Sequence, residues 1–210
     1  MKKYKILFAL IDNRSELLKS FVASLIGMYD YTKQYHQVNI MNIDGNFIDQ
    51  MRNVAVETAI NGKYDYIFFI DTDMIYPKDA VIKLLSDKKD IVGGLYFKRK
   101  YPHGECHFKQ ISDINNKKAI ETFPEGTIKR VKATGFGGVL VKTKVFKNMK
   151  FPYFKVRYSR RNGKLTMIGE DIDFCMKAGK KYGIWIDPKV KYGHIGLMAV
   201  YGNKDMRELL

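Results

Sequence analysis

An apolar run that ends in two carboxylates constrains the fold of this chain more than any other sequence feature. Residues Tyr66 to Ile70 are all apolar or aromatic, and Asp71, Thr72 and Asp73 follow them directly. A continuous run of this length is typical of a strand that is buried on both faces of a parallel sheet. Since open α/β sheets bind ligands beyond the carboxyl ends of their strands, the run predicts a polar site at Asp71 and Asp73.

Strand-like and helix-like segments alternate around this run. Three more apolar segments have the length of strands: residues 5–11, 38–43 and 90–95. Helical spacing is found in residues 15–26 and 48–59, and a third helix is expected to start at Pro77, which suits a first helical position. The alternation predicts an α/β fold with a Rossmann-like, mostly parallel central sheet flanked by helices.

The second half of the chain is less regular. Residues 100–132 carry turn residues and weak periodicity, which indicates a small β-rich excursion. Gly137 and Gly138 interrupt a strand-like run, either because the backbone approaches a ligand or because a helix packs there. Glu170 and Asp171 open another helix. The buried stripe expected on that helix is Ile172, Cys175, Met176 and Gly179.

The size of the chain, its cysteines and its N-terminus suggest a single cytoplasmic domain. A length of 210 residues with 46% hydrophobic content is enough for one core. Cys106 and Cys175 are far apart, which argues against a disulfide framework and favours a reducing compartment. The apolar run from Ile6 is cut short at Asp12, so no leader peptide is expected. No apolar run approaches the length of a membrane span.

An excess of basic residues bears on the choice of partners. Lysine and arginine total 37 against 22 acids, which gives a formal charge of +15. Such a charge attracts nucleotides, nucleic acid, anionic lipid or acidic glycans, although scattered lysines also simply solvate a surface. Basic and aromatic residues alternate over residues 155–164, around the turn signal Asn162-Gly163. We expect a mobile basic loop there, which would contact an anionic membrane surface or DNA, or recruit an acidic acceptor.

The acidic pair and two later segments are candidates for chemistry. In an extended segment the side chains of Asp71 and Asp73 point to the same side. There they chelate one hard cation, or hold a metal and a ribose. Alternatively, they only cap the following turn. Glu170 and Asp171 cap a helix, or Asp171 points inward as a general base for a hydroxyl. His194 is either a structural histidine or a ligand for manganese, or less suitably magnesium.

One further cluster resembles a zinc site but lacks the fourth ligand that such a site needs. Its members are His103, Cys106 and His107.

A family resemblance emerges when five segments are considered together. They are residues 68–74, 91–96, 133–138, 169–171 and 193–196. In order and spacing this combination resembles the GT-A glycosyltransferases over nearly the whole chain, and more narrowly the compact, inverting, family-2-like members of bacteria, phages and large viruses. The resemblance implies a GT-A fold, a nucleotide-diphospho-sugar donor, with a UDP-sugar favoured, and Mn²⁺ or Mg²⁺ as cofactor. It also implies a nucleotide-sugar half over 1–98 and an acceptor-binding, catalytic half over 99–210.

The resemblance also implies roles for individual residues. Asp73 and His194 would be metal ligands, and Asp71 would be shared between metal and donor. Asp171 would be the general base, and Glu170 would hold acceptor or sugar hydroxyls.

The donor-binding residues that the resemblance implies are Asp12, Arg14, Asp44, Arg52, Thr72, Gly137 and Gly138. Arg52 with Asn53 resembles the family's Arg-Asn pair near the donor, Asp44 resembles the acid that reads the base, and the glycines would line the sugar pocket. The sequence departs from the family where Ile11-Asp12-Asn13-Arg14 replaces the usual Pro-Thr-Tyr-Asn, and where only one aspartate precedes Gly45.

Two other functions compete with sugar transfer to a glycan, glycoprotein or modified DNA. A sugar nucleotidyltransferase would share a layered sheet and an acidic metal site, but no glycine-rich basic loop follows the first strand here. A nucleic-acid-binding module would explain the charge of +15 and the 13% aromatic content. No helix-turn-helix, zinc finger or RNP signature supports that module.

Overall fold

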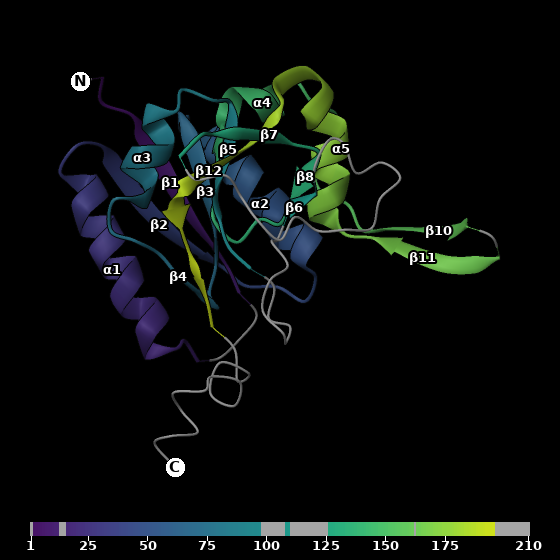
Figure 1. Cartoon of the computed structure of the whole chain (residues 1–210), viewed down its shortest axis with the longest axis horizontal. Helices are drawn as coiled ribbons and strands as arrows, with labels where there is room; N and C mark the ends of the chain where they lie inside the picture. Colours follow the sequence, from purple (N-terminus) through teal and green to yellow (C-terminus); the bar gives the residue numbers. More distant parts are fainter. Residues whose placement is uncertain (1, 13–15, 98–107, 110–125, 162, 196–210) are drawn as a thin grey trace, which may run out of the picture.

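The computed structural model describes residues 2–12, 16–97, 108–109, 126–161 and 163–195 (Figure 1). Its central sheet has seven strands in the order β2-β1-β3-β9-β5-β12-β7. In chain order their bounds are β1 (Lys5–Ile11), β2 (Gln37–Ile43), β3 (Tyr66–Asp71), β5 (Ile91–Leu95), β7 (Lys129–Val131), β9 (Val139–Lys142) and β12 (Ile184–Lys191). Strands β9 and β7 run opposite to the other five. The Rossmann-like, mostly parallel sheet is therefore confirmed.

Helices cover both faces of the sheet (Figure 1). Helices α1 (Lys19–Lys33) and α3 (Ala80–Ser86) pack on one face. The other face is covered by α2 (Ile48–Asn61), α4 (Thr143–Lys147) and α5 (Glu170–Tyr182). None of the helices among the described residues is both long and apolar enough to cross a membrane.

The apolar run of β3 fills the cores on both sides of the sheet. Phe68 and Ile70 belong to the cluster beneath α1 and α3, whereas Ile67 and Phe69 belong to the cluster beneath α2, α4 and α5. Because successive side chains of a strand point to opposite faces, a strand covered on both sides has no polar position. This explains why the run lacks alternation.

Three small two-stranded sheets complete the described structure. Strand β4 (Met74–Ile75) pairs with β13 (Gly193–His194), and β6 (Phe108–Lys109) pairs with β8 (Ala133–Thr134). Strands β10 (Arg157–Arg161) and β11 (Lys164–Ile168) form a hairpin that projects beyond the body of the molecule (Figure 1). The loop expected over 155–164 was therefore wrong for 157–161 and for Lys164, which pair as strands, with Gly163 at φ of +74° in the turn between them.

Two expected helix starts were also wrong. Helix α1 begins at Lys19, and Leu17 and Leu18 before it are more than 40% exposed, so an earlier turn would gain no packing. Helix α3 begins at Ala80 and not at Pro77, whose carbonyl accepts a hydrogen bond from the Ala80 amide in a preceding turn.

The buried stripe of α5 differs from the expected one. Met176 is 47% exposed, and the buried residues include the polar Glu170 and Asp173 together with Phe174, Cys175 and Ala178. A stripe inferred from apolar residues misses these acids, whose burial depends on partners from other elements.

Phe69 tests how much the core contributes to stability. Its ring contacts those of Phe136, Phe146 and Phe154, at centroid distances of 5.3, 6.2 and 5.4 Å. We expect Phe69→Ala to lower the free energy of unfolding by about 3–5 kcal/mol in urea titrations, since it leaves a cavity. The exposed Phe47 is the matched control, and Phe47→Ala should cost less than about 0.5 kcal/mol. Equal costs would contradict this account of the core.

Candidate functional site at the carboxyl edge of the sheet

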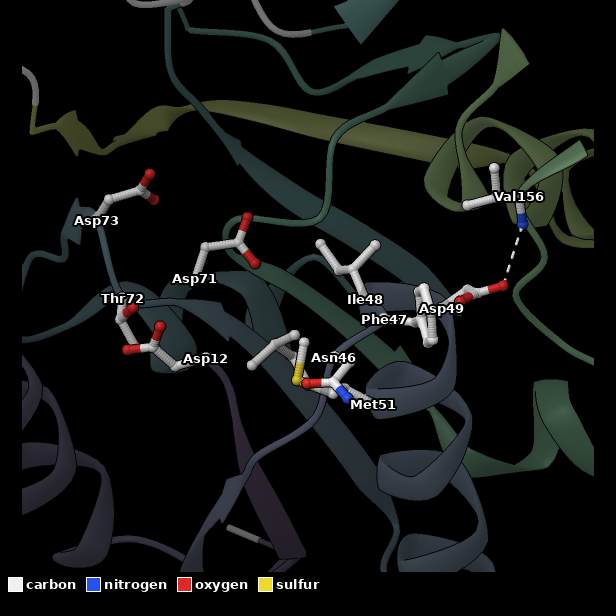
Figure 2. Close-up of a pocket in the computed structure, with 11 residues that line it drawn as sticks. Asp12, Asn46, Phe47, Ile48, Asp49, Met51, Asp71, Thr72, Asp73 and Val156 are labelled. Atoms are coloured by element: carbon white, nitrogen blue, oxygen red, sulfur yellow. Dashed lines mark hydrogen bonds between the residues drawn. The ribbon is translucent and has the colours of Figure 1, made fainter. Parts of the chain in front are cut away.

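A cavity of about 640 Å³ lies where β1 and β3 end and α2 begins (Figure 2). It is lined by Ile11, Asp12, Asn46, Phe47, Ile48, Asp49, Met51, Asp71, Thr72, Asp73 and Val156. Its size is within the range of small-molecule sites. The apolar run thus leads to a cavity at the end of its strand, as the sequence predicted.

The cavity carries the opposite charge to the chain as a whole. Four of its lining residues are the carboxylates Asp12, Asp49, Asp71 and Asp73, and none of the described lining residues is basic. Asp49 is held in place by its own contacts, since its carboxylate accepts hydrogen bonds from the Val156 amide (3.3 Å) and the Gln50 amide (2.9 Å). A cavity with this lining attracts cations and repels a bare diphosphate.

Asp71 and Asp73 engage different partners. The chain leaves β3 in a turn at Thr72 and Asp73, so the extended geometry expected for this segment is not found. Asp71 Oδ1 accepts a hydrogen bond from Arg52 Nη2 at 3.2 Å, whereas Asp73 Oδ2 lies 3.7 Å from His194 Nε2. The two carboxylates border one cavity but belong to separate contacts.

A backbone pairing between distant segments brings His194 to Asp73. His194 of β13 is paired with Met74 of β4, and the Ile195 amide donates to the Asp73 carbonyl at 2.8 Å. His194 Nδ1 lies 2.8 Å from the Phe97 carbonyl oxygen, which can only accept, so Nδ1 carries the proton. The other ring nitrogen, Nε2, faces Asp73 Oδ2 at 3.7 Å.

This arrangement suits a metal ligand. Metal-binding histidines commonly donate their other ring nitrogen to a carbonyl or carboxylate, as His194 does to Phe97. Within the described ranges, however, no group of three or more His, Cys, Asp or Glu residues could hold a metal ion. A cation at Asp73 and His194 would therefore need further ligands from water or a bound substrate.

Arg52 joins the cavity to the start of α5. Its side chain is buried and forms ion pairs with Asp71, at 3.2 Å, and with Glu170. The guanidinium also lies 5.4 Å from the ring centre of Phe136. Burial opposes its charge, but Asp71, Glu170 and the nearby Asp171 together raise the pKa of Arg52, so it stays protonated.

Glu170 and Asp171 differ in their surroundings. Glu170 is buried, which raises its pKa, although Arg52 acts in the opposite direction. Asp171 is half-buried in the first turn of α5, and its Oδ1 accepts a hydrogen bond from the adjacent Ile172 amide at 2.6 Å. The N-cap of the helix is Gly169, so the expected capping role of Asp171 is not found. Neither residue lines the cavity. Both lie near Arg52, whose other partner, Asp71, does line it.

The chain bends at Gly137 and Gly138, just before β9, and this glycine bend lies against Asp71. A Cβ atom at Gly137 would stand 3.0 Å from Asp71 Oδ2, and at Gly138, where φ is +137°, it would stand 2.3 Å from the Tyr192 ring. Tyr76 contacts both the Asp71 carbonyl (3.0 Å) and the Gly137 carbonyl (3.2 Å). The bend therefore supports the acidic residue from behind and does not line the cavity itself.

Buried tyrosines around this bend were missed in the sequence. Tyr96 accepts a hydrogen bond from the Gly137 amide at 3.3 Å, and Tyr192 donates to the Gly138 carbonyl at 3.1 Å. Burial raises the pKa values of Tyr76 and Tyr96 well above their ordinary value, so both are neutral hydroxyls. The position of Tyr96 immediately after the predicted strand at 90–95 was the available signal for that residue.

Two polar residues fasten the segment that enters the hairpin. Asn53 accepts hydrogen bonds from the amides of Tyr153 (3.0 Å) and Phe154 (3.2 Å) and donates to the Phe154 carbonyl (2.8 Å). Asp173 is completely buried and pairs with Arg157 at 2.6 Å and with Lys177 at 2.5 Å. Asp173 was not expected; a lysine four residues later in the helix was its only sequence signal.

Other predicted residues are not brought to the cavity. Asp44 is exposed just beyond the end of β2, where it accepts a hydrogen bond from Asn42 at 2.8 Å. Arg14 lies outside the described residues, as does the whole of the His103, Cys106 and His107 cluster.

Comparison with known proteins shows a shared fold. No known family model matches the sequence, and no curated protein does. Among solved structures, A197 from STIV is 18% identical, with a TM-score of 0.61 over 92% of this chain and 86% of that chain. Apo-UDP-glucose pyrophosphorylase is 8% identical, with a TM-score of 0.52 over 91% of this chain and 92% of that chain. These likenesses support the Rossmann-like α/β architecture.

The Arg52 pair makes a prediction about stability. Arg52→Met would leave Asp71 and Glu170 without their buried countercharge, so we expect a loss of about 3–5 kcal/mol in the free energy of unfolding. Arg130→Met is the matched control, because Arg130 is exposed. Adding Glu170→Gln to Arg52→Met should restore part of the loss in a double-mutant cycle measured in urea. Additive costs would show that the two side chains are not coupled.

Proposed function

We propose that this protein is a metal-dependent, inverting glycosyltransferase that transfers a sugar from a nucleotide-diphospho-sugar, with a UDP-sugar favoured, to an acceptor hydroxyl. The observation that carries the proposal is the contact between His194 Nε2 and Asp73 Oδ2 at the acidic cavity. It offers two ligands of the kinds that manganese accepts and leaves the remaining positions to substrate oxygens.

The charge of the cavity supports a metal-bound diphosphate. A nucleotide diphosphate would meet four carboxylates there, and the described lining supplies no cationic side chain to offset them. Asp73 and His194 would hold Mn²⁺ or Mg²⁺, and Asp71 would be shared with the donor. When bound, the cation would stabilise the negative charge that develops on the leaving diphosphate.

The remaining lining residues suit the nucleoside part of the donor. Phe47 and Ile48 offer an apolar wall at the start of α2, and Asp12 and Thr72 offer polar groups across the cavity (Figure 2). UDP-glucose pyrophosphorylase, which has the same fold, is by its name an enzyme of a nucleotide sugar. That likeness supports the class of donor.

Asp171 would act as the general base. As the acceptor oxygen forms its bond to the anomeric carbon, Asp171 would take the hydroxyl proton, and the bond between that carbon and the diphosphate oxygen would break with its electron pair leaving on the diphosphate. Attack from the opposite face inverts the anomeric centre. Glu170 would bind acceptor or sugar hydroxyls, and Arg52 would position Glu170 and Asp71 through its two ion pairs.

A sugar nucleotidyltransferase is the second candidate. Its support is the overlap with UDP-glucose pyrophosphorylase over 91% of this chain. Against it, a nucleoside triphosphate would bring more negative charge to a cavity whose described lining residues include four carboxylates and no basic residue. Release of pyrophosphate from a triphosphate and a sugar phosphate would support this function and contradict sugar transfer.

Donor binding is tested by thermal shift. A panel of UDP, GDP, CMP and dTDP sugars, with and without Mn²⁺, should raise the melting temperature most for a UDP-sugar with the metal. At a ligand concentration 100 times Kd the stabilisation is about 2.7 kcal/mol. Asp73→Asn and His194→Gln should each abolish the part that depends on Mn²⁺, whereas the exposed control Asp30→Asn should retain it. The absence of a shift with every nucleotide would refute the proposal.

The general base is tested separately from binding. Asp171→Asn should lower turnover by about 10²–10⁴-fold, because the amide cannot accept the proton. Its thermal shift with donor and metal should remain that of the unmodified protein. A variant that retains full turnover would assign the base to another residue.

A further inference from the structure

The β10–β11 hairpin has one face that contacts the body and one that does not. Residues opposite each other on paired strands share a face, as do residues two apart on one strand. The register pairs Tyr158 with Met167 and Arg160 with Leu165, so these four side chains share a face. Arg157, one residue away, lies on the other face.

The Arg157 face is turned toward α5. Arg157 Nε pairs with the buried Asp173 at 2.6 Å, and its Nη2 lies 4.0 Å from the sulfur of Met176. The face of Tyr158 is therefore the one that points away from α5. The hairpin itself projects beyond the body of the molecule (Figure 1). Tyr158 is 67% exposed, Leu165 68% and Met167 62%.

The outward face combines apolar and basic groups. Three large apolar side chains stand together on a narrow ribbon, with Arg160 among them. Leaving such side chains in water is unfavourable, and grouped exposed apolar residues mark interaction sites. The hairpin's regular pairing fixes their arrangement in advance of any partner.

We propose that this face docks the protein onto an anionic lipid bilayer. Leu165 and Met167 would enter the hydrocarbon boundary, and the Tyr158 ring would lie at the level of the headgroups, where amphipathic aromatic side chains are favoured. Arg160 would meet a lipid phosphate, and a basic side chain near an anionic surface increases binding roughly fivefold.

Two other occupants suit the face less well. Nucleic acid binds single bases by stacking on aromatic rings, and Tyr158 is the only aromatic residue among the four. A second copy of the chain would bring Arg160 against the Arg160 of the first, within a molecule whose formal charge is already +15. A bilayer matches both the apolar groups and the sign of the charge.

Docking there would place the cavity near the lipid surface. Val156, just before β10, lines the cavity, and Gly169 is all that separates β11 from Glu170. Lipid binding itself requires neither donor nor metal, so it does not rest on the proposed sugar transfer. Failure of one proposal leaves the other standing.

Co-sedimentation with lipid vesicles tests the proposal. The whole protein should sediment with vesicles that contain 30% phosphatidylserine in phosphatidylcholine and remain in solution with phosphatidylcholine alone. The triple variant Tyr158→Ser, Leu165→Ser, Met167→Ser should bind the anionic vesicles at least about tenfold more weakly, because it removes the apolar part of the contact. Arg160→Ser should weaken binding and reduce its sensitivity to salt.

The matched control replaces exposed apolar residues elsewhere. Ile26 on α1 and Ile40 on β2 are 54% and 43% exposed, and Ile26→Ser with Ile40→Ser should leave vesicle binding unchanged. Thermal melting of each variant verifies folding. Absence of sedimentation with anionic vesicles, or an unchanged affinity in the triple variant, would overturn the proposal. Equal loss in the control would overturn it as well, since the contact would then not be specific to the hairpin.

Discussion

The buried guanidinium of Arg52 is the interaction on which the site depends. It ties together the end of β3 through Asp71, the start of α5 through Glu170, and its own helix α2. Moving a charge out of water is costly, and the cost is offset only when its partners are close and well oriented. Any shift of β3 or α5 would leave an unpaired charge in the interior. The geometry of the cavity edge is therefore coupled to the stability of the fold.

The same network separates the two acids of the β3 terminus. Asp71 is committed to Arg52, whereas Asp73 lies near His194 and at the cavity. A positively charged protein can concentrate anionic ligands at its surface, but an acidic cavity admits them only with a cation. Under the proposed function, long-range attraction and local repulsion would together favour a donor that arrives with a metal, which net charge alone does not require.

The sequence predicted the elements better than the contacts between them. The strand at 66–71 was evident because burial on both faces removes polar residues, and α2 was evident from its spacing. The position of His194 depends on the pairing of β13 with β4, which is a long-range contact that no local pattern encodes. Asp173 was missed for a similar reason, since its burial depends on Arg157 from the hairpin. Apolar periodicity detects the core but not buried ion pairs.

The direction of β9 explains why glycines meet Asp71. This strand runs antiparallel between β3 and β5, so it begins at the edge of the sheet where its neighbours end. Gly137 and Gly138 immediately precede it, and only a residue without a side chain leaves room for Asp71 Oδ2 and the Tyr192 ring. One reversed strand thus brings a second backbone segment to the carboxyl edge. A fully parallel sheet would instead deliver that segment to the opposite edge, far from the acids.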